Sequence, residues 1–199
     1  MEEIVDWLER PPEELPREEA WKVTGERFEA AVLYAEMAAR RSACQWELPI
    51  REEENIFGML LPELQKARNL GRVIALRARL HILERDYEVA MHTLQTGFAL
   101  ARDVSRQPTL VSGLVGMAIA RLMLDQVDLL VQQPGLPSLY WTLARLPDPV
   151  VDLRAGLEME AQSLFLLFPE LRHIEEGPRP PEEWQHLLHE VGERLMGLS

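Results

Sequence analysis

Apolar residues recur every three to four positions along most of the chain, the spacing typical of amphipathic α-helices. Prolines and glycines divide this pattern into segments. We predict a short opening helix before Pro11, helices over residues 17–41, 62–85, 86–104, 109–132 and 151–168, a short piece at 139–146, and a last helix from about Pro181. The alternation typical of strands is nearly missing, so the predicted fold class is all-α.

The connections between most predicted helices are short, which favours antiparallel helical hairpins. Residues 42–61 are predicted as a connection, with Pro62 in the first turn of the next helix, where a missing N–H costs nothing. Residues 109–132 are apolar on most sides, so we expect that helix to be central. Its small residues Gly113, Gly116 and Ala120 would let a neighbouring backbone come close.

At 199 residues, the chain has the length of a single all-α domain. We expect residues 1–16 to form a short helix and a proline-rich linker, residues 17–176 the helical core, and residues 177–199 a proline-rich hinge and terminal helix.

Charge is distributed unevenly along this acidic chain, whose formal net charge is −12. Residues 61–121 carry 9 basic and 5 acidic side chains, whereas the segments on either side are strongly acidic. This basic block indicates either charge complementarity between neighbouring helices or a site for an acidic peptide or small anion. Because an acidic chain repels a phosphate backbone, no nucleic-acid partner is expected.

One segment, residues 72–101, resembles a tetratricopeptide repeat, a hairpin of two helices. The residues that carry the likeness are Asp86-Tyr87 at the turn, small Ala90, large Leu94, and the pair Gly97-Phe98. Arg85 departs from that family's pattern, which has Gly before Asp-Tyr. The likeness implies a tetratricopeptide-like or α-solenoid-like stack of hairpins, although no second copy at a 34-residue period is present.

A second likeness extends over more of the chain. The segments Cys44-Gln45-Trp46-Glu47-Leu48-Pro49, Thr93-Leu94-Gln95-Thr96-Gly97 and Leu139-Tyr140-Trp141 resemble a set found in a family of bacterial helical proteins. That family has no known activity to carry over. The resemblance implies an export signal and further helices in members, so that this chain would be a fragment or a truncated relative.

Three arginines are the candidate partner-binding residues. Arg68, Arg72 and Arg79 lie near one face of the helix predicted from Pro62, at spacings of four and seven. On the inner surface of a hairpin stack they could bind a peptide carboxylate through bidentate hydrogen bonds. Alternatively, they pair with carboxylates of this chain, for which the candidates are Glu63, Glu84, Asp86 and Glu88.

The last predicted helix supplies a rival hypothesis, a metal site or an enzyme. His186 is followed at spacings of three and four by His189 and Glu190, which places them on one helical face, as metal ligands require. The alternative interpretation is a polar, solvent-facing side of an amphipathic helix. The order of these residues is not that of the zinc proteases.

The single cysteine, Cys44, excludes an intrachain disulfide. Arg40 and Arg41 upstream could lower its thiol pKa, whereas packing beside Trp46 would make it an inert core residue. The chain contains no phosphate-binding glycine loop, nucleophile elbow or dinucleotide fingerprint. We therefore predict no cofactor, and an enzyme is the less favoured class.

The leading hypothesis is a helical interaction module with a protein or peptide partner, and the pattern also allows a homo-oligomer. A third hypothesis is a purely structural segment whose opening helix docks on sequence outside this chain. The longest uncharged stretch, residues 107–120, is shorter than the ~20 residues of a membrane span. The start Met1-Glu2-Glu3-Ile4 lacks the features of a signal peptide, which predicts a cytoplasmic protein, or an exported one if a longer precursor exists.

Overall fold

All regular secondary structure that we describe in the computed structural model is helical. The description covers residues 1–41, 43–44, 56–136, 138–144, 146–167 and 180–197. The elements are α1 (Glu2–Glu9), the 3-10 turn η1 (Pro12–Glu14), α2 (Arg17–Ala39), α3 (Ile56–Leu83), α4 (Tyr87–Ser105), α5 (Leu110–Val131), α6 (Tyr140–Ala144), α7 (Arg154–Leu167) and α8 (Pro181–Gly197). The predicted all-α class is confirmed for these residues.

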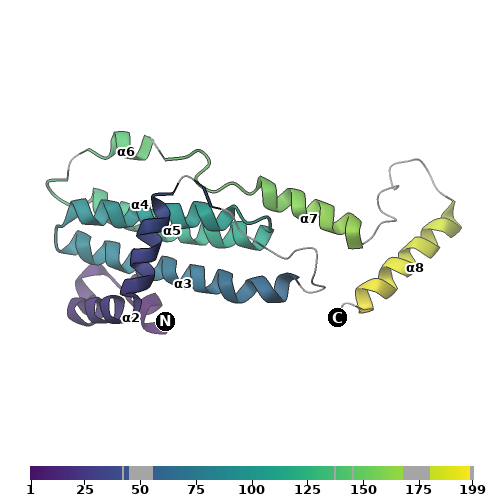
Figure 1. Cartoon of the computed structure of the whole chain (residues 1–199), viewed down its shortest axis with the longest axis horizontal. Helices are drawn as coiled ribbons and strands as arrows, with labels where there is room; N and C mark the ends of the chain where they lie inside the picture. The colour runs from purple at the N-terminus through teal and green to yellow at the C-terminus, as the bar shows by residue number, and fades with distance from the viewer. Residues whose placement is uncertain (42, 45–55, 137, 145, 168–179, 198–199) are drawn as a thin grey trace. The chain divides into compact units, whose positions relative to one another are not determined.

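Helices α3, α4 and α5 form the centre of the fold. They lie side by side, and each contacts the other two (Figure 1). Ile74 and Leu80 of α3, Ala90 of α4 and Met123 of α5 are completely buried between them. The predicted central position of residues 109–132 agrees with these contacts.

The first two helices pack onto this centre. Helix α1 lies against α3 and buries Ile4 and Trp7. Helix α2 contacts α3 and α4 and buries Ala20, Thr24 and Val32. The opening helix thus packs on α3 of this chain through Ile4 and Trp7, and the hypothesis of a structural segment that docks on sequence outside the chain stays a prediction.

The turn between α3 and α4 is held by backbone hydrogen bonds at the end of α3. The Asp86 N–H donates to the His81 carbonyl at 2.9 Å, and the Arg85 N–H donates to the Ile82 carbonyl at 3.1 Å. This pair of bonds is the Schellman motif, which requires a left-handed residue, and Arg85 has φ +64°. The motif ends α3 and sends the chain back along it as α4.

The turn between α4 and α5 is fixed by a side-chain cap and a close backbone approach. Thr109 Oγ1 accepts a hydrogen bond from the Ser112 N–H at 3.1 Å, which satisfies one of the free donors at the start of α5. A Cβ added at Gly116 would come 2.7 Å from the Ala101 carbonyl oxygen of α4. The expectation that Gly116 lets a neighbouring backbone come close is confirmed.

The start of α3 differs from the sequence prediction. The helix begins at Ile56, so Pro62 lies inside it and not in its first turn. The prediction of a connection over the whole of residues 42–61 is wrong at its C-terminal end. A proline within a helix removes one backbone hydrogen bond and its ring crowds the carbonyl four residues earlier, yet the helical run from Ile56 continues across Pro62.

The chain divides into two compact units, Met1–Gly156 and Leu157–Ser199, with the boundary inside α7. The expected boundary near residue 177 lies outside the described residues, and the expectation of a single domain stays a prediction. No described helix has the length and apolar character that a membrane span requires.

Candidate functional site

The three predicted arginines line one pocket in the first unit. Arg68, Arg72 and Arg79 all project from α3 into a hollow of about 390 Å³ between α1, α3 and α5. The other lining residues come from α1 and α5: Val5, Leu8, Glu9, Ala118, Arg121, Leu122, Asp125 and Gln126. We call this hollow the arginine pocket.

Arg79 forms the floor of the arginine pocket and is 8% exposed. Its Nη1 donates to the carbonyl oxygens of Trp7 at 3.0 Å and of Arg10 at 3.1 Å, at the C-terminal end of α1. Its Nε donates to Gln126 Oε1 of α5 at 2.9 Å. Burial lowers the pKa of this guanidinium, and nearby Asp125 opposes that shift. Arg79 therefore ties α1 to α3 and α5.

Arg68 and Arg72 are the accessible arginines of the pocket. Arg68 is exposed, whereas Arg72 is partly buried and donates to Asn69 Oδ1 of its own helix at 3.0 Å. The pKa of Arg72 is lowered, first by burial and then by the positive charge of Arg68. Among the described residues, no carboxylate lies within 4.0 Å of the guanidinium nitrogens of either arginine. The two positive side chains thus repel each other, and the acidic residues that line the same hollow, Glu9 and Asp125, lie beyond ion-pair distance of both.

Three of the four carboxylates considered as partners of these arginines have other neighbours. Glu63 pairs with Lys66 at 2.7 Å, and Glu84 accepts a hydrogen bond from Trp21 Nε1 at 2.5 Å. Asp86 lies 3.7 Å from His81 Nδ1. The alternative in which neighbouring carboxylates of α3 and α4 neutralise the arginine stripe therefore has no ion pair to support it in the described part of the chain.

A fourth arginine of the pocket was missed by the sequence reasoning. Arg121 of α5 lines the same hollow and pairs with Asp125 at 2.9 Å. Its membership depends on α3 and α5 lying side by side, which the helical pattern does not specify. The available signal was its position at the end of the basic block, residues 61–121.

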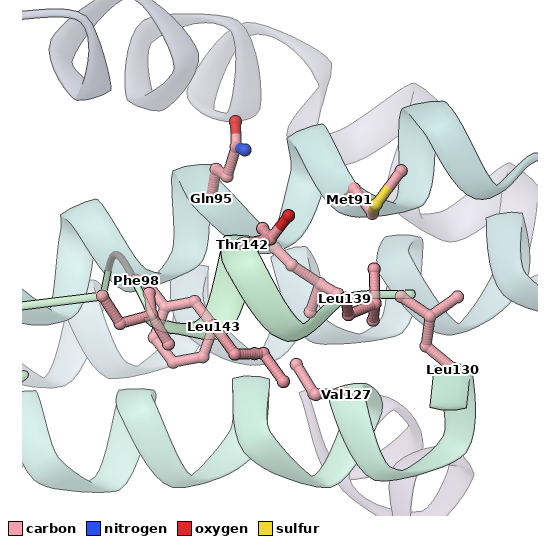
Figure 2. Close-up of a pocket in the computed structure, with 10 residues that line it drawn as sticks. Met91, Gln95, Phe98, Val127, Leu130, Leu139, Thr142 and Leu143 are labelled. Atoms are coloured by element: carbon pink, nitrogen blue, oxygen red, sulfur yellow. The ribbon is translucent and has the colours of Figure 1, made fainter. Parts of the chain in front are cut away.

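A second hollow, between α4, α5 and α6, has almost no polar lining. Figure 2 shows Phe98 of α4, Val127 of α5 and Leu143 of α6 gathered around it. Its volume is about 40 Å³. Pockets that hold small molecules usually measure ~300–1,000 Å³. This hollow is therefore a packing gap under α6.

The histidines of the rival hypothesis lie in the second unit. His186 and His189 are exposed on α8, and the side chain of Glu190 lies outside the described residues. The described side chains include no group of three or more His, Cys, Asp or Glu placed to hold a metal ion. The geometry adds no support to a metal site at these residues.

Cys44 is partly buried near the C-terminal end of α4. Burial raises the pKa of its thiol, and Asp103 raises it further, against the opposing effect of Arg106 and Arg102. A raised pKa disfavours the thiolate, which is the reactive form. The predicted lowering by Arg40 and Arg41 is therefore not what this environment produces, and Trp46 lies outside the described residues.

Comparison with known proteins gives no further identification. No family model, curated protein or solved structure matches the chain. The likeness to tetratricopeptide repeats and to a bacterial family stays a prediction, and residues 45–49 of the latter lie outside the described part. The arginine pocket is accordingly the feature on which a functional proposal can be built.

Proposed function

We propose that this protein is a helical interaction module that binds a carboxylate of a protein or peptide partner in the arginine pocket. The observation that carries the proposal is the pair Arg68 and Arg72, two neighbouring guanidinium groups with no ion-pair partner among the described residues. A chain of net charge −12 offers many carboxylates that could pair with these arginines. None of the described carboxylates lies within 4.0 Å of their guanidinium nitrogens. An incoming carboxylate would relieve their mutual repulsion and accept bidentate hydrogen bonds.

We further propose that the scaffold is a tetratricopeptide-like stack. From α2 to α5, each helix contacts the next helix and the next but one, as helices of stacked hairpins do. An up-and-down four-helix bundle would also bring its first and last helices together, but α2 and α5 make no extensive contact through their described residues. The arginine pocket lies between α3 and α5, which would be the first helices of successive hairpins.

Local features of the α3–α4 hairpin support the same proposal. Arg85 adopts φ +64° at the position where the tetratricopeptide pattern has Gly. Ala90 is completely buried, and a Cβ added at Gly97 would overlap Met123 of α5. Small residues therefore stand where α4 lies closest to its neighbours, as the resemblance implies.

The test uses an array of random-sequence peptides in two forms, one with free C-terminal carboxylates and one with C-terminal amides. We expect the protein to bind a subset of the free acids and to bind their amides less tightly. Replacing Arg68 or Arg72 by Gln should weaken that binding about tenfold or more, since a charged hydrogen bond contributes ~1.5–3 kcal/mol. Fluorescence anisotropy with the selected peptides measures the dissociation constants.

The matched control is Arg27→Gln, which removes the same charge from an exposed position on α2. It should leave peptide affinity unchanged at constant ionic strength. Equal losses in Arg27→Gln and Arg68→Gln would show that only net charge matters and would contradict the proposal. Arg79 is unsuitable as a probe, because its replacement also removes the hydrogen bonds that hold α1.

A further inference from the structure

The outward face of α5 carries a stripe of four exposed apolar residues and two charged ones. Its exposed fractions are 52% for Leu114, 47% for Met117, 41% for Leu124 and 50% for Val131. Together with the charged residues Arg121 and Asp128, they occupy six positions along α5. The spacing between successive positions alternates between three and four residues. That alternation is the heptad pattern of a helix that packs along a second helix.

The stripe is separate from the face of α5 that packs in the fold. Ile119, Met123 and Leu130 point into the centre and are at most 1% exposed. The six stripe residues lie within an arc of about 100° when successive residues turn by about 100°. Burying a large apolar side chain stabilises by ~1.5–3 kcal/mol, so this face gains from a partner that the described part of the first unit does not supply.

The positions of Arg121 and Asp128 in the stripe favour a second copy of this chain as the partner. In an antiparallel pair of α5 helices whose register aligns the whole stripe, Leu114 lies opposite Val131 of the second copy, and Arg121 lies opposite Leu124 of the second copy. Asp128 of the second copy then lies about 5 Å further along, one layer away, within reach of the Arg121 guanidinium. Two-fold symmetry produces this ion pair twice.

A parallel pair of α5 helices would have the opposite effect. It would place Arg121 beside Arg121 and Asp128 beside Asp128, and like charges in facing positions destabilise a helix pair. Arg121 already pairs with Asp125 of its own helix, but it is 74% exposed and can turn outward, because such surface pairs contribute little stability. The charge order therefore favours one arrangement of one partner.

We propose that the α5 stripe is the interface of a homodimer, in which two α5 helices pack antiparallel about a two-fold axis. The dimer is independent of peptide binding in the arginine pocket. It is tested by the molecular mass of the protein in solution. A partner of another kind would need the same alternation of apolar and opposite charges, whereas a second copy provides it by symmetry.

The first experiment measures the mass of the full chain by sedimentation equilibrium over a range of concentrations. We expect a mass that rises toward twice 22.9 kDa, and we expect Leu124→Glu to remain at the monomer mass. The matched control is Leu33→Glu, at a 54% exposed leucine of α2, which should dimerise like the unmodified chain. Circular dichroism checks that all three chains are folded.

A charge exchange tests the register. Asp128→Arg should abolish the dimer because it gathers four arginines at the interface, and adding Arg121→Asp in the same chain should restore it by reversing both ion pairs. A monomer at every concentration, or a Leu124→Glu variant that still dimerises, would overturn the proposal. So would a chain lacking residues 181–199 that dimerises when the full chain does not, since α8 would then be the occupant.

Discussion

At the residue scale, Arg85 adopts a backbone conformation that its Cβ disfavours but that the end of α3 requires. The Schellman motif at the end of α3 needs a left-handed residue, and Arg85 adopts φ +64° there although its Cβ disfavours that conformation. The hydrogen bonds of the motif hold it in place. The free-energy cost of this left-handed conformation therefore falls on an exposed residue, and no described contact depends on its side chain.

Arg85→Gly should stabilise the protein. Glycine removes the Cβ penalty of ~1–2 kcal/mol, and its greater freedom in the unfolded chain returns part of that gain. We expect the free energy of unfolding to rise by about 0.5–1 kcal/mol, measured by urea denaturation. Arg85→Ala is the control, since it removes the side chain but keeps the Cβ, and it should give no such gain.

At the element scale, the approach of α4 and α5 depends on glycine. Gly116 faces backbone atoms of α4 at Ala101, whereas Gly25 of α2 has no atom within 4 Å of where a Cβ would be. The sequence alone correctly predicted a close approach at Gly116. It did not predict which helix would come close, because that depends on the direction of the α4–α5 turn.

Gly116→Ala should therefore destabilise the protein although alanine favours helices. The new Cβ would lie 2.7 Å from the Ala101 carbonyl oxygen, and one helix must move. Such overpacking costs ~1–3 kcal/mol, and the melting temperature should fall by several degrees.

Gly25→Ala is the matched control, in the open position on α2. It should raise the melting temperature slightly, since alanine exceeds glycine in helix propensity by ~1 kcal/mol. Equal behaviour of the two variants in thermal melts followed by circular dichroism would contradict the packing at Gly116.

At the scale of the whole molecule, the stability of the first unit depends on residues before α7. The two apolar clusters of the described residues end at Val150 and Val151, ahead of the unit boundary at Gly156. No described residue after Val151 belongs to either cluster. The first unit should therefore fold without them.

A fragment of residues 1–167 should melt within about 2 °C of the full chain, because it keeps every described residue of both apolar clusters. A fragment of residues 1–131 also loses Leu139, which is 9% exposed within the larger cluster. Its melting temperature should fall by about 4 °C or more. Similar losses in both fragments, measured by calorimetry, would contradict this division.

The sequence by itself determined where most helices lie along the chain and which of their faces are apolar. Periodicity and breakers predicted α4 and α5 to within about two residues, because these signals act within a few turns of chain. The same local rules missed the start of α3, where Pro62 looked like a boundary but lies inside the helix.

Only the tertiary structure decided how residues distant in sequence come together. The pattern gave Arg68, Arg72 and Arg79 the same role, yet packing divided them, because α1 covers Arg79 and leaves Arg68 and Arg72 accessible. It also brought Arg121 to their pocket and left the stripe on α5 uncovered by the described residues of the first unit. Helical periodicity indicates which faces are apolar, but the neighbour that buries each face is chosen by the packing of the whole chain.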